Sequence, residues 1–257
     1  MSGVPFLCEE IAAKTRRLYG RAVDAMTEVT VTAGATEALF CAITALVRAD
    51  DEVIVFDPVY DLYEPVIELA GGHAVHVPLQ GREHRIDWQR VAAALNDKTR
   101  AIIINNPHNP TGATWSEEDV ATLAELLRGR DTFVIADEVY EHIVFDGVPH
   151  QSLNRHEELA ARSLVISSFG KTFHATGWKI GYCVAPPRLT EELRKIHQFV
   201  TFSIDTPMQH AYAEYLNSNP EHYTALPEFY QAKRDLFCPL LNSSRFQLPP
   251  SGAPYFQ

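Results

Sequence analysis

The sequence predicts an α/β fold in three layers, with a mostly parallel β-sheet covered by helices on both faces. Two observations lead to this expectation. Short apolar runs with strand character alternate with helical patterns along most of the 257 residues. Strands that are joined by helices pair in parallel, because the helical crossover returns the chain to the edge of the sheet from which it started.

The alternation can be followed element by element. Apolar runs of four or five residues that are bounded by turn-forming residues indicate strands, and these are expected at residues 28–32, 53–56, 74–77, 101–104, 133–136, 164–167 and 181–185. Apolar residues at helical spacing separate most of these runs, and helices are expected at residues 36–47, 61–70, 88–95 and 117–127.

The end of the chain has a different pattern. After Leu189 the sequence is helical in character through Leu241, and two strand-like runs follow at residues 245–248 and 253–257. The second run reaches the last residue with no later strand to pair with, and an open strand edge is usually paired or covered. We therefore expect that the C-terminal part of a second domain is missing.

Composition and charge narrow the classes of function. With 46% hydrophobic and 21% charged residues, the chain is typical of a globular protein. Its net charge of −11 argues against nucleic acid and against an anionic membrane surface as partners. The four cysteines lack Cys-x-x-Cys spacing, so we expect reduced thiols and no metal site. The sequence has no apolar run of membrane-spanning length and no secretory signal, which favours a cytoplasmic location.

One lysine has the surroundings of a residue that reacts with an aldehyde. Lys171 lies among apolar and small residues in Ser-Ser-Phe-Gly-Lys-Thr-Phe-His (residues 167–174), where desolvation would disfavour its charged form. A neutral amine condenses with an aldehyde, and the aldehyde that this context suggests is pyridoxal 5′-phosphate. Ser168 and Lys179 are residue types that can bind its phosphate. Because Ser-x-x-Lys is common, the argument depends on further segments.

Two of these segments follow predicted strands, where ligands of open α/β sheets bind. Gly34, Ala35 and Thr36 open a helix after the strand at 28–32. Backbone N–H groups at a helix N-terminus bind anions, so Ala35 and Thr36 are assigned to the phosphate, although an ordinary N-cap is an equally good explanation here. Tyr60 follows the strand at 53–56 and could stack on a flat cofactor, but a single tyrosine there is more often a core or turn residue.

Two more segments follow the strands at 101–104 and 133–136. Asn109 lies in Asn-Asn-Pro-His-Asn-Pro-Thr-Gly (residues 105–112), where two turns with proline restrict the backbone, and its amide can donate to a phenolate oxygen. Asp137 ends a buried strand, and a carboxylate there needs a cationic partner such as a protonated pyridine nitrogen. That pairing makes the ring an electron sink. Tyr140 would reach the same phenolate oxygen as Asn109.

The motifs occur in a fixed order along the chain: Gly-Ala-Thr-Glu, Asp-Pro-x-Tyr, Asn-Pro-x-Asn-Pro-Thr-Gly, Asp-Glu-Val-Tyr, and Ser-Ser-Phe-Gly-Lys-Thr-Phe followed by Gly-Trp-Lys-x-Gly-Tyr. This set resembles the class I/II aminotransferases among the pyridoxal-phosphate enzymes of fold type I. Within them it is most similar to the branch that contains methionine aminotransferase and the kynurenine and glutamine aminotransferases. The resemblance covers essentially the whole chain.

The resemblance implies a role for each candidate residue. Lys171, which would form the Schiff base and carry the proton, Asp137 and Tyr140 correspond to the catalytic residues. The residues that correspond to the cofactor ligands are Gly34, Ala35, Thr36, Tyr60, Asn109, Asp137, Tyr140, Ser168, Lys171 and Lys179. Many relatives have arginine at the position of Lys179, and a lysine keeps the charge but lacks the bidentate fork.

The resemblance also implies an activity and an organisation. It implies a homodimeric aminotransferase that moves an amino group between an L-amino acid of the methionine, glutamine or aromatic type and a 2-oxo acid. Residues 1–225 would form the large cofactor-binding domain, and residues 226–257 a connecting helix and the start of an incomplete small domain. The family pattern further implies an N-terminal segment before Met1 and a C-terminal arginine for the substrate carboxylate after Gln257.

Two alternatives stay open at this point. A β-lyase that acts on cysteine conjugates would use the same cofactor contacts. A truncated fragment that binds the cofactor without turnover would explain both ends of the chain.

Overall fold

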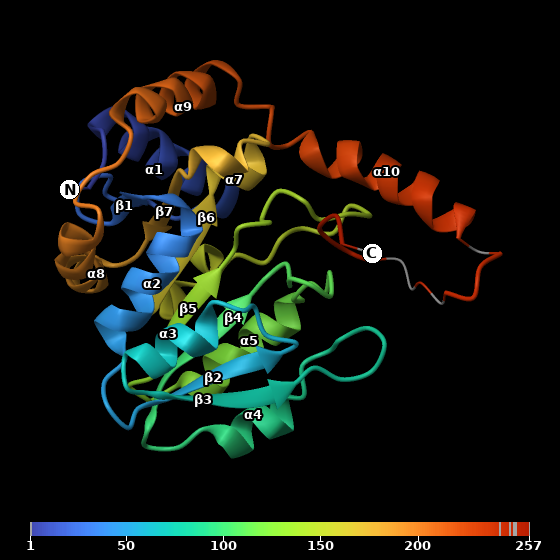
Figure 1. The fold of residues 1–257 in the computed structure, drawn as a ribbon, viewed down its shortest axis with the longest axis horizontal. Helices are drawn as coiled ribbons and strands as arrows, with labels where there is room; N and C mark the ends of the chain where they lie inside the picture. The colour runs from blue at the N-terminus through green and yellow to red at the C-terminus, as the bar shows by residue number, and fades with distance from the viewer. Residues whose placement is uncertain (1, 242, 247, 249–250, 257) are drawn as a thin grey trace.

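The computed structural model describes residues 2–241, 243–246, 248 and 251–256, and one seven-stranded sheet forms its centre (Figure 1). The strands are β1 (Val29–Thr32), β2 (Glu52–Asp57), β3 (His73–Pro78), β4 (Thr99–Asn105), β5 (Phe133–Asp137), β6 (Ser163–Ser168) and β7 (Gly181–Val184). Their order across the sheet is β1-β7-β6-β5-β4-β2-β3. Only β7 is antiparallel to its neighbours, β1 and β6, so the other six strands run in the same direction.

Helices cover both faces of this sheet (Figure 1). The helices are α1 (Pro5–Tyr19), α2 (Gly34–Leu46), α3 (Tyr63–Leu69), α4 (Trp88–Ala94), α5 (Glu117–Leu127), α6 (Glu157–Ala160), α7 (Phe169–Thr172), α8 (Pro187–Val200), α9 (Thr206–Ser218) and α10 (Leu226–Leu240), with 3-10 turns η1 (Leu153–Arg155) and η2 (Thr176–Trp178). Alternate side chains of β4 point to opposite faces. Ile103 packs in the core under α2, α3 and α8, whereas Ile102 and Ile104 pack in the core under α4 and α5. The three-layer α/β/α prediction is therefore confirmed.

Every strand and helix predicted before residue 242 is present, but the sequence analysis missed α1 and the single-turn helices α6 and α7. Helix α1 begins with a proline at its first position and ends at Gly20, which has a left-handed backbone. Leu7, Cys8 and Ile11 are buried at helical spacing, and they pack in the core that α1 shares with α9, β1 and β7. Both the terminal signals and the spacing were therefore present in the sequence.

The sequence analysis placed no helix between the strands expected at residues 164–167 and 181–185, and the chain makes no parallel crossover there. Residues 169–180 contain only the single-turn helix α7 and the turn η2. A parallel connection needs a crossover of a dozen or more residues, usually a full helix. The chain instead reverses, and β7 pairs antiparallel with β6.

The two strands predicted near the end of the chain are also absent from the described residues. Residues 243–246, 248 and 251–256 contain no strand, while 247 and 257 lie outside the described part of those predictions. The segment docks on the loop after β5 instead, where the Phe145 N–H donates to the Gly252 carbonyl at 2.9 Å. The described residues of the segment are thus held by single contacts and not by the repeated backbone hydrogen bonds of a β-sheet. In Figure 1, α10 projects away from the sheet and its covering helices.

None of the described helices combines the length and the hydrophobicity needed to cross a membrane.

Candidate active site

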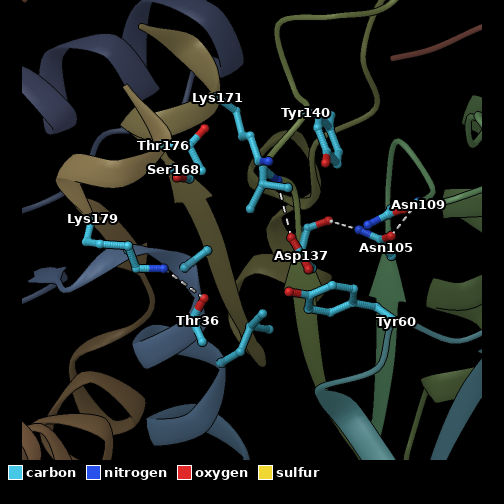
Figure 2. A pocket seen from close by; sticks show the side chains of 14 residues that line it. Thr36, Tyr60, Asn105, Asn109, Asp137, Tyr140, Ser168, Lys171, Thr176 and Lys179 are labelled. Atoms are coloured by element: carbon cyan, nitrogen blue, oxygen red, sulfur yellow. Dashed lines mark hydrogen bonds between the residues drawn. The ribbon is translucent and has the colours of Figure 1, made fainter. Parts of the chain in front are cut away.

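A cavity of about 180 Å³ lies where the segments that follow β1, β2, β4, β5 and β6 meet (Figure 2). Its lining residues are Gly34, Ala35, Thr36, Leu39, Tyr60, Asn105, Asn109, Asp137, Val139, Tyr140, Ser168, Lys171, Thr176 and Lys179. All ten residues that the sequence predicts as cofactor ligands are in this set. The carboxyl ends of strands that run in the same direction come together at one edge, which explains how residues more than 100 positions apart share one cavity.

Lys171 is positioned by the reversal between β6 and β7. It lies in α7 immediately after β6, and Figure 2 shows its side chain directed toward Asp137 and Tyr140. Its Nζ is 5.4 Å from the centre of the Tyr140 ring. Phe169, two residues earlier, is buried and stacks on Tyr212. This packing fixes the single turn of helix that carries the amine.

Asp137 is a buried carboxylate at the end of β5, with 4% of its surface exposed. Its Oδ2 accepts a hydrogen bond from the Tyr63 hydroxyl at 2.6 Å. Burial raises the pKa of Asp137 to about 6, although the hydrogen bond from Tyr63 opposes this shift. No Lys, Arg or His in the described part of the chain forms an ion pair with it. A carboxylate with these properties favours a ligand that brings a positive charge or a strong donor.

The opposite end of the cavity is suited to an anion. Ala35 and Thr36 lie in the first turn of the 13-residue helix α2, and Lys179 Nζ is 3.4 Å from Thr36 Oγ1 (Figure 2). Gly34 has a φ of 72°, in the left-handed region that favours glycine. The helix N-terminus and the ammonium group together favour negative charge at this position.

β7 supports this turn from behind. A Cβ on Gly181, the first residue of β7, would lie 2.6 Å from the backbone N of Ala35. Glycine is therefore required here for the close approach of β7 to the α2 turn.

Asn105 and Tyr63 are two residues of the site that the sequence analysis missed. The Asn105 side chain accepts from the Asn109 N–H at 2.6 Å and donates to the Asp137 carbonyl at 3.1 Å, so it fixes the Asn109 loop to β5. Tyr63 contacts the ring of Tyr60 edge-on, with centroids 5.5 Å apart, while it donates to Asp137. Two features of the sequence could have indicated these residues: the i, i+3 spacing of Tyr60 and Tyr63, and the repeated asparagines at 105, 106 and 109.

Tyr140 lies between the cavity and the C-terminal segment. It is buried, and burial raises the pKa of its phenol. Its ring contacts those of Tyr255 and Phe256 edge-on, with centroids 5.5 Å away in each case. The hydroxyl is therefore held on the cavity wall as a neutral hydrogen-bonding group.

Known proteins are similar to this chain in sequence and in architecture. A methionine aminotransferase of Escherichia coli (strain K12) is 53% identical over 256 residues, which cover 100% of this chain and 66% of that protein. A kynurenine–oxoglutarate transaminase of Dictyostelium discoideum is 39% identical over 244 residues, 88% of this chain and 55% of that protein. A crystal structure of an Escherichia coli protein with a reported methionine aminotransferase function superposes with a TM-score of 0.96 at 53% identity, over 98% of this chain and 67% of that one.

The chain thus spans about half to two thirds of the length of the curated relatives it matches. A family model described as "Aminotransferase class I and II" matches residues 1–257, and enzymes of this family depend on pyridoxal 5′-phosphate. The mostly parallel seven-stranded sheet matches the fold-type I aminotransferase structures. Together, the family match and the shared fold show that the chain belongs to the class I and II aminotransferases.

Proposed function

We propose that this chain is the cofactor-binding part of an aminotransferase that moves an amino group between an L-amino acid and a 2-oxo acid. The observation that carries the proposal is that Lys171, Asp137 and the anion-binding turn of α2 line one cavity. The names of the relatives favour methionine or an aromatic amino acid as the substrate, and the resemblance of the motifs adds glutamine to this class.

The groups in the cavity fit pyridoxal 5′-phosphate. Asp137 would pair with the ring nitrogen, because its buried carboxylate has no ion-pair partner among the described residues. Asn109 and Tyr140 would bind the phenolic oxygen, and Tyr60 would stack on the ring. The phosphate would be held by the residues at the other end of the cavity, which are Gly34, Ala35, Thr36, Ser168 and Lys179.

The residues of the chain would divide the work as follows. When bound, the cofactor takes up the amino group of the substrate and draws electrons from its α-carbon. Lys171 Nζ would accept the α-proton as a general base and return it at the end of the transfer. Asp137 would hold a proton on the ring nitrogen by its negative charge. Tyr140 and Asn109 would orient the ring by hydrogen bonds to one of its oxygens.

Reductive trapping tests the role of Lys171. The protein is mixed with pyridoxal 5′-phosphate and reduced with borohydride, and the labelled residue is mapped by peptide mass spectrometry. We expect a stoichiometric adduct on Lys171 and none in Lys171→Ala. Transamination by Lys171→Ala should fall by ~100-fold or more, since a positioned general base contributes at least this much.

Lys179→Ala is the matched control for that experiment. This lysine also lines the cavity, but its removal should weaken cofactor binding while the adduct stays on Lys171. Label spread over surface lysines, or an undiminished adduct in Lys171→Ala, would contradict the proposal.

We also propose a cytoplasmic homodimer in which residues 1–225 form the large domain and residues 226–257 lead into a second one. Exposed large apolar side chains such as Trp178 and Phe202 favour a partner surface. The projection of α10 (Figure 1) favours the boundary at its first residue. Sedimentation of the protein tests the dimer, because a monomer at micromolar concentration would contradict it.

A further inference from the structure

A buried carboxylate lies directly behind the anion-binding turn. Glu37 follows Thr36 in α2, and only 7% of its surface is exposed. It does not line the cavity. Its carboxylate instead accepts hydrogen bonds from the backbone N–H of Ala33, from His197 Nδ1–H at 2.7 Å and from the Thr201 hydroxyl at 2.7 Å. Glu37 therefore connects the turn to α8.

The charge of Glu37 is unfavourable for an anion in the cavity. Two negative groups near the same helix end repel each other. The charge of Glu37 therefore does not help to bind an anion, and another role must explain a carboxylate at this position. Burial alone would raise the pKa of Glu37, but the hydrogen bonds from His197, Thr201 and Ala33 outweigh it and lower the pKa. The group stays ionised, and the three donors that hold it are all outside the cavity.

The Ala33 N–H shows what this arrangement does for the turn. Ala33 is the N-cap residue of α2, and it offers no side chain to cap the helix. The Glu37 carboxylate satisfies this N–H from within the helix, and the Thr32 hydroxyl donates to the Gly34 carbonyl at 2.9 Å. With Gly181 packed against the other side of the turn, the backbone that presents the N–H groups of Ala35 and Thr36 is fixed at both faces.

We propose that Glu37 is a positioning residue for the phosphate group of the ligand, which it serves by holding the backbone of residues 33–36. The inference rests on the proposed function, because it takes pyridoxal 5′-phosphate as the ligand. It implies that Glu37 contributes to binding of the phosphate alone, and that the contacts of the ring with Asp137, Asn109 and Lys171 do not depend on it.

Two ligands that differ only in the phosphate separate these contributions. The dissociation constants of pyridoxal 5′-phosphate and of pyridoxal are measured by absorbance for the wild-type protein, Glu37→Ala and Glu37→Gln. The dissociation constant of pyridoxal divided by that of pyridoxal 5′-phosphate measures the contribution of the phosphate. We expect this ratio to fall ~10-fold in Glu37→Ala, as for the loss of a hydrogen bond to a charged group. The affinity for pyridoxal should be unchanged.

Glu37→Gln should restore most of the ratio. Its amide oxygen can still accept from Ala33, and its NH₂ can donate to Nδ1 of the other His197 tautomer. If Glu37 acted only through its negative charge, Glu37→Gln would lower the ratio as much as Glu37→Ala does. If Glu37→Ala does not fold, Glu37→Asp takes its place, because the side chain is one methylene too short to reach Ala33 and should lower the ratio in the same way.

Ile43→Ala is the control for general destabilisation. Ile43 is buried later in the same helix and packs in the core rather than on the turn. This variant should lose stability and keep the ratio. Equal weakening of both ligands in Glu37→Ala, or a lowered ratio in Ile43→Ala, would overturn the positioning role. A wild-type protein that yields no borohydride adduct on Lys171 would instead refute the proposed function, and the inference with it.

Discussion

At the scale of single residues, the hydrogen bond from Tyr63 to Asp137 extends the pH range over which this carboxylate is ionised. The pKa of Asp137 is raised to about 6 by burial, and the Tyr63 hydroxyl holds it below the value that burial alone would give. In the role proposed for Asp137, the carboxylate must be ionised to pair with the cationic ring of the cofactor. Cofactor affinity should therefore fall as the pH decreases through about 6.

Tyr63→Phe removes this donor and keeps the ring that contacts Tyr60. The pKa of Asp137 should then rise, so the loss of affinity should begin at a higher pH than in the wild type. At neutral pH we expect affinity to be lower by ~10-fold. Absorbance titrations of the two proteins from pH 5 to pH 9 measure this, and titration of the cofactor itself cancels in the comparison. Superimposable pH profiles would show that Tyr63 does not act on Asp137.

The clustering of the ten candidate ligands in one cavity could be predicted because most of them lie at or just after the end of a strand, in a sheet whose ligand edge is known from topology. Tyr63 could not be assigned in this way. It lies within α3, and its hydroxyl meets Asp137 only because α3 packs over the sheet beside β5. Glu37 is a similar case, since its partners His197 and Thr201 are 160 or more positions away and the sequence gives no sign of this pairing.

At the scale of elements, a buried ion pair attaches α1 to the loop that carries Tyr140. Lys14 is 3% exposed and donates to Glu141 Oε1 and to the Tyr182 hydroxyl, each at 2.7 Å. Burial on its own would raise the pKa of Glu141, but the charge of Lys14 and several hydrogen bonds hold it well below its usual value. The two charges therefore compensate each other inside the protein.

Lys14→Met should destabilise the protein by about 3–5 kcal/mol, because it leaves a buried carboxylate without its cation. The double variant Lys14→Met/Glu141→Leu should recover much of this loss, since an apolar pair of similar volume is often as stable as a buried ion pair. Urea unfolding of the wild type, the single variant and the double variant measures both values. A double variant less stable than Lys14→Met would mean that Glu141 stabilises the loop without Lys14.

Most elements were predictable because their apolar periodicity is local, and the exceptions depend on information that is not local. The direction of β7 depends on how little helix residues 169–180 form, rather than on the strand itself. The strand-like residues 253–256 have the right composition, but the C-terminal segment docks on the loop after β5 and not on the edge strands β1 and β3. Composition alone could not distinguish these cases.

At the scale of the whole molecule, Arg234 ties α10 to the body of the protein. Its guanidinium forms two hydrogen bonds to the Asp146 carboxylate, at 2.6 and 2.7 Å, and a third to the Ser251 carbonyl at 2.9 Å. Asp146 lies in the loop after β5, and in the same loop the Phe145 N–H donates a hydrogen bond to the Gly252 carbonyl. One arginine thus joins the projecting helix, the C-terminal segment and the loop next to Tyr140.

Arg234→Met should loosen the C-terminal segment without unfolding the domain. We expect the Phe145 amide, which donates to Gly252, to exchange its hydrogen ~10-fold faster, corresponding to the loss of about 1.4 kcal/mol of local stability. Hydrogen-exchange mass spectrometry of the 140–150 region measures the change. Lys233→Met is the control, because this neighbouring lysine contacts the exposed ring of Phe229 on the same helix. Equal exchange in both variants would show that Arg234 does not hold the segment.

The reversed strand β7 also sets the order in which the protein can be completed during synthesis. Within the described part of the chain, β1 pairs with no strand other than β7, and its residue Thr32 lies opposite Gly181. About 150 residues must leave the ribosome after β1 before its partner exists, which takes on the order of ten seconds. During that time the side of the Val-Thr-Val-Thr segment that will face β7 has unpaired backbone groups, a template for aggregation. The turn that follows it, residues 33–36, acquires its support from Gly181 only when β7 arrives, so the proposed phosphate site is incomplete until β7 has been synthesised.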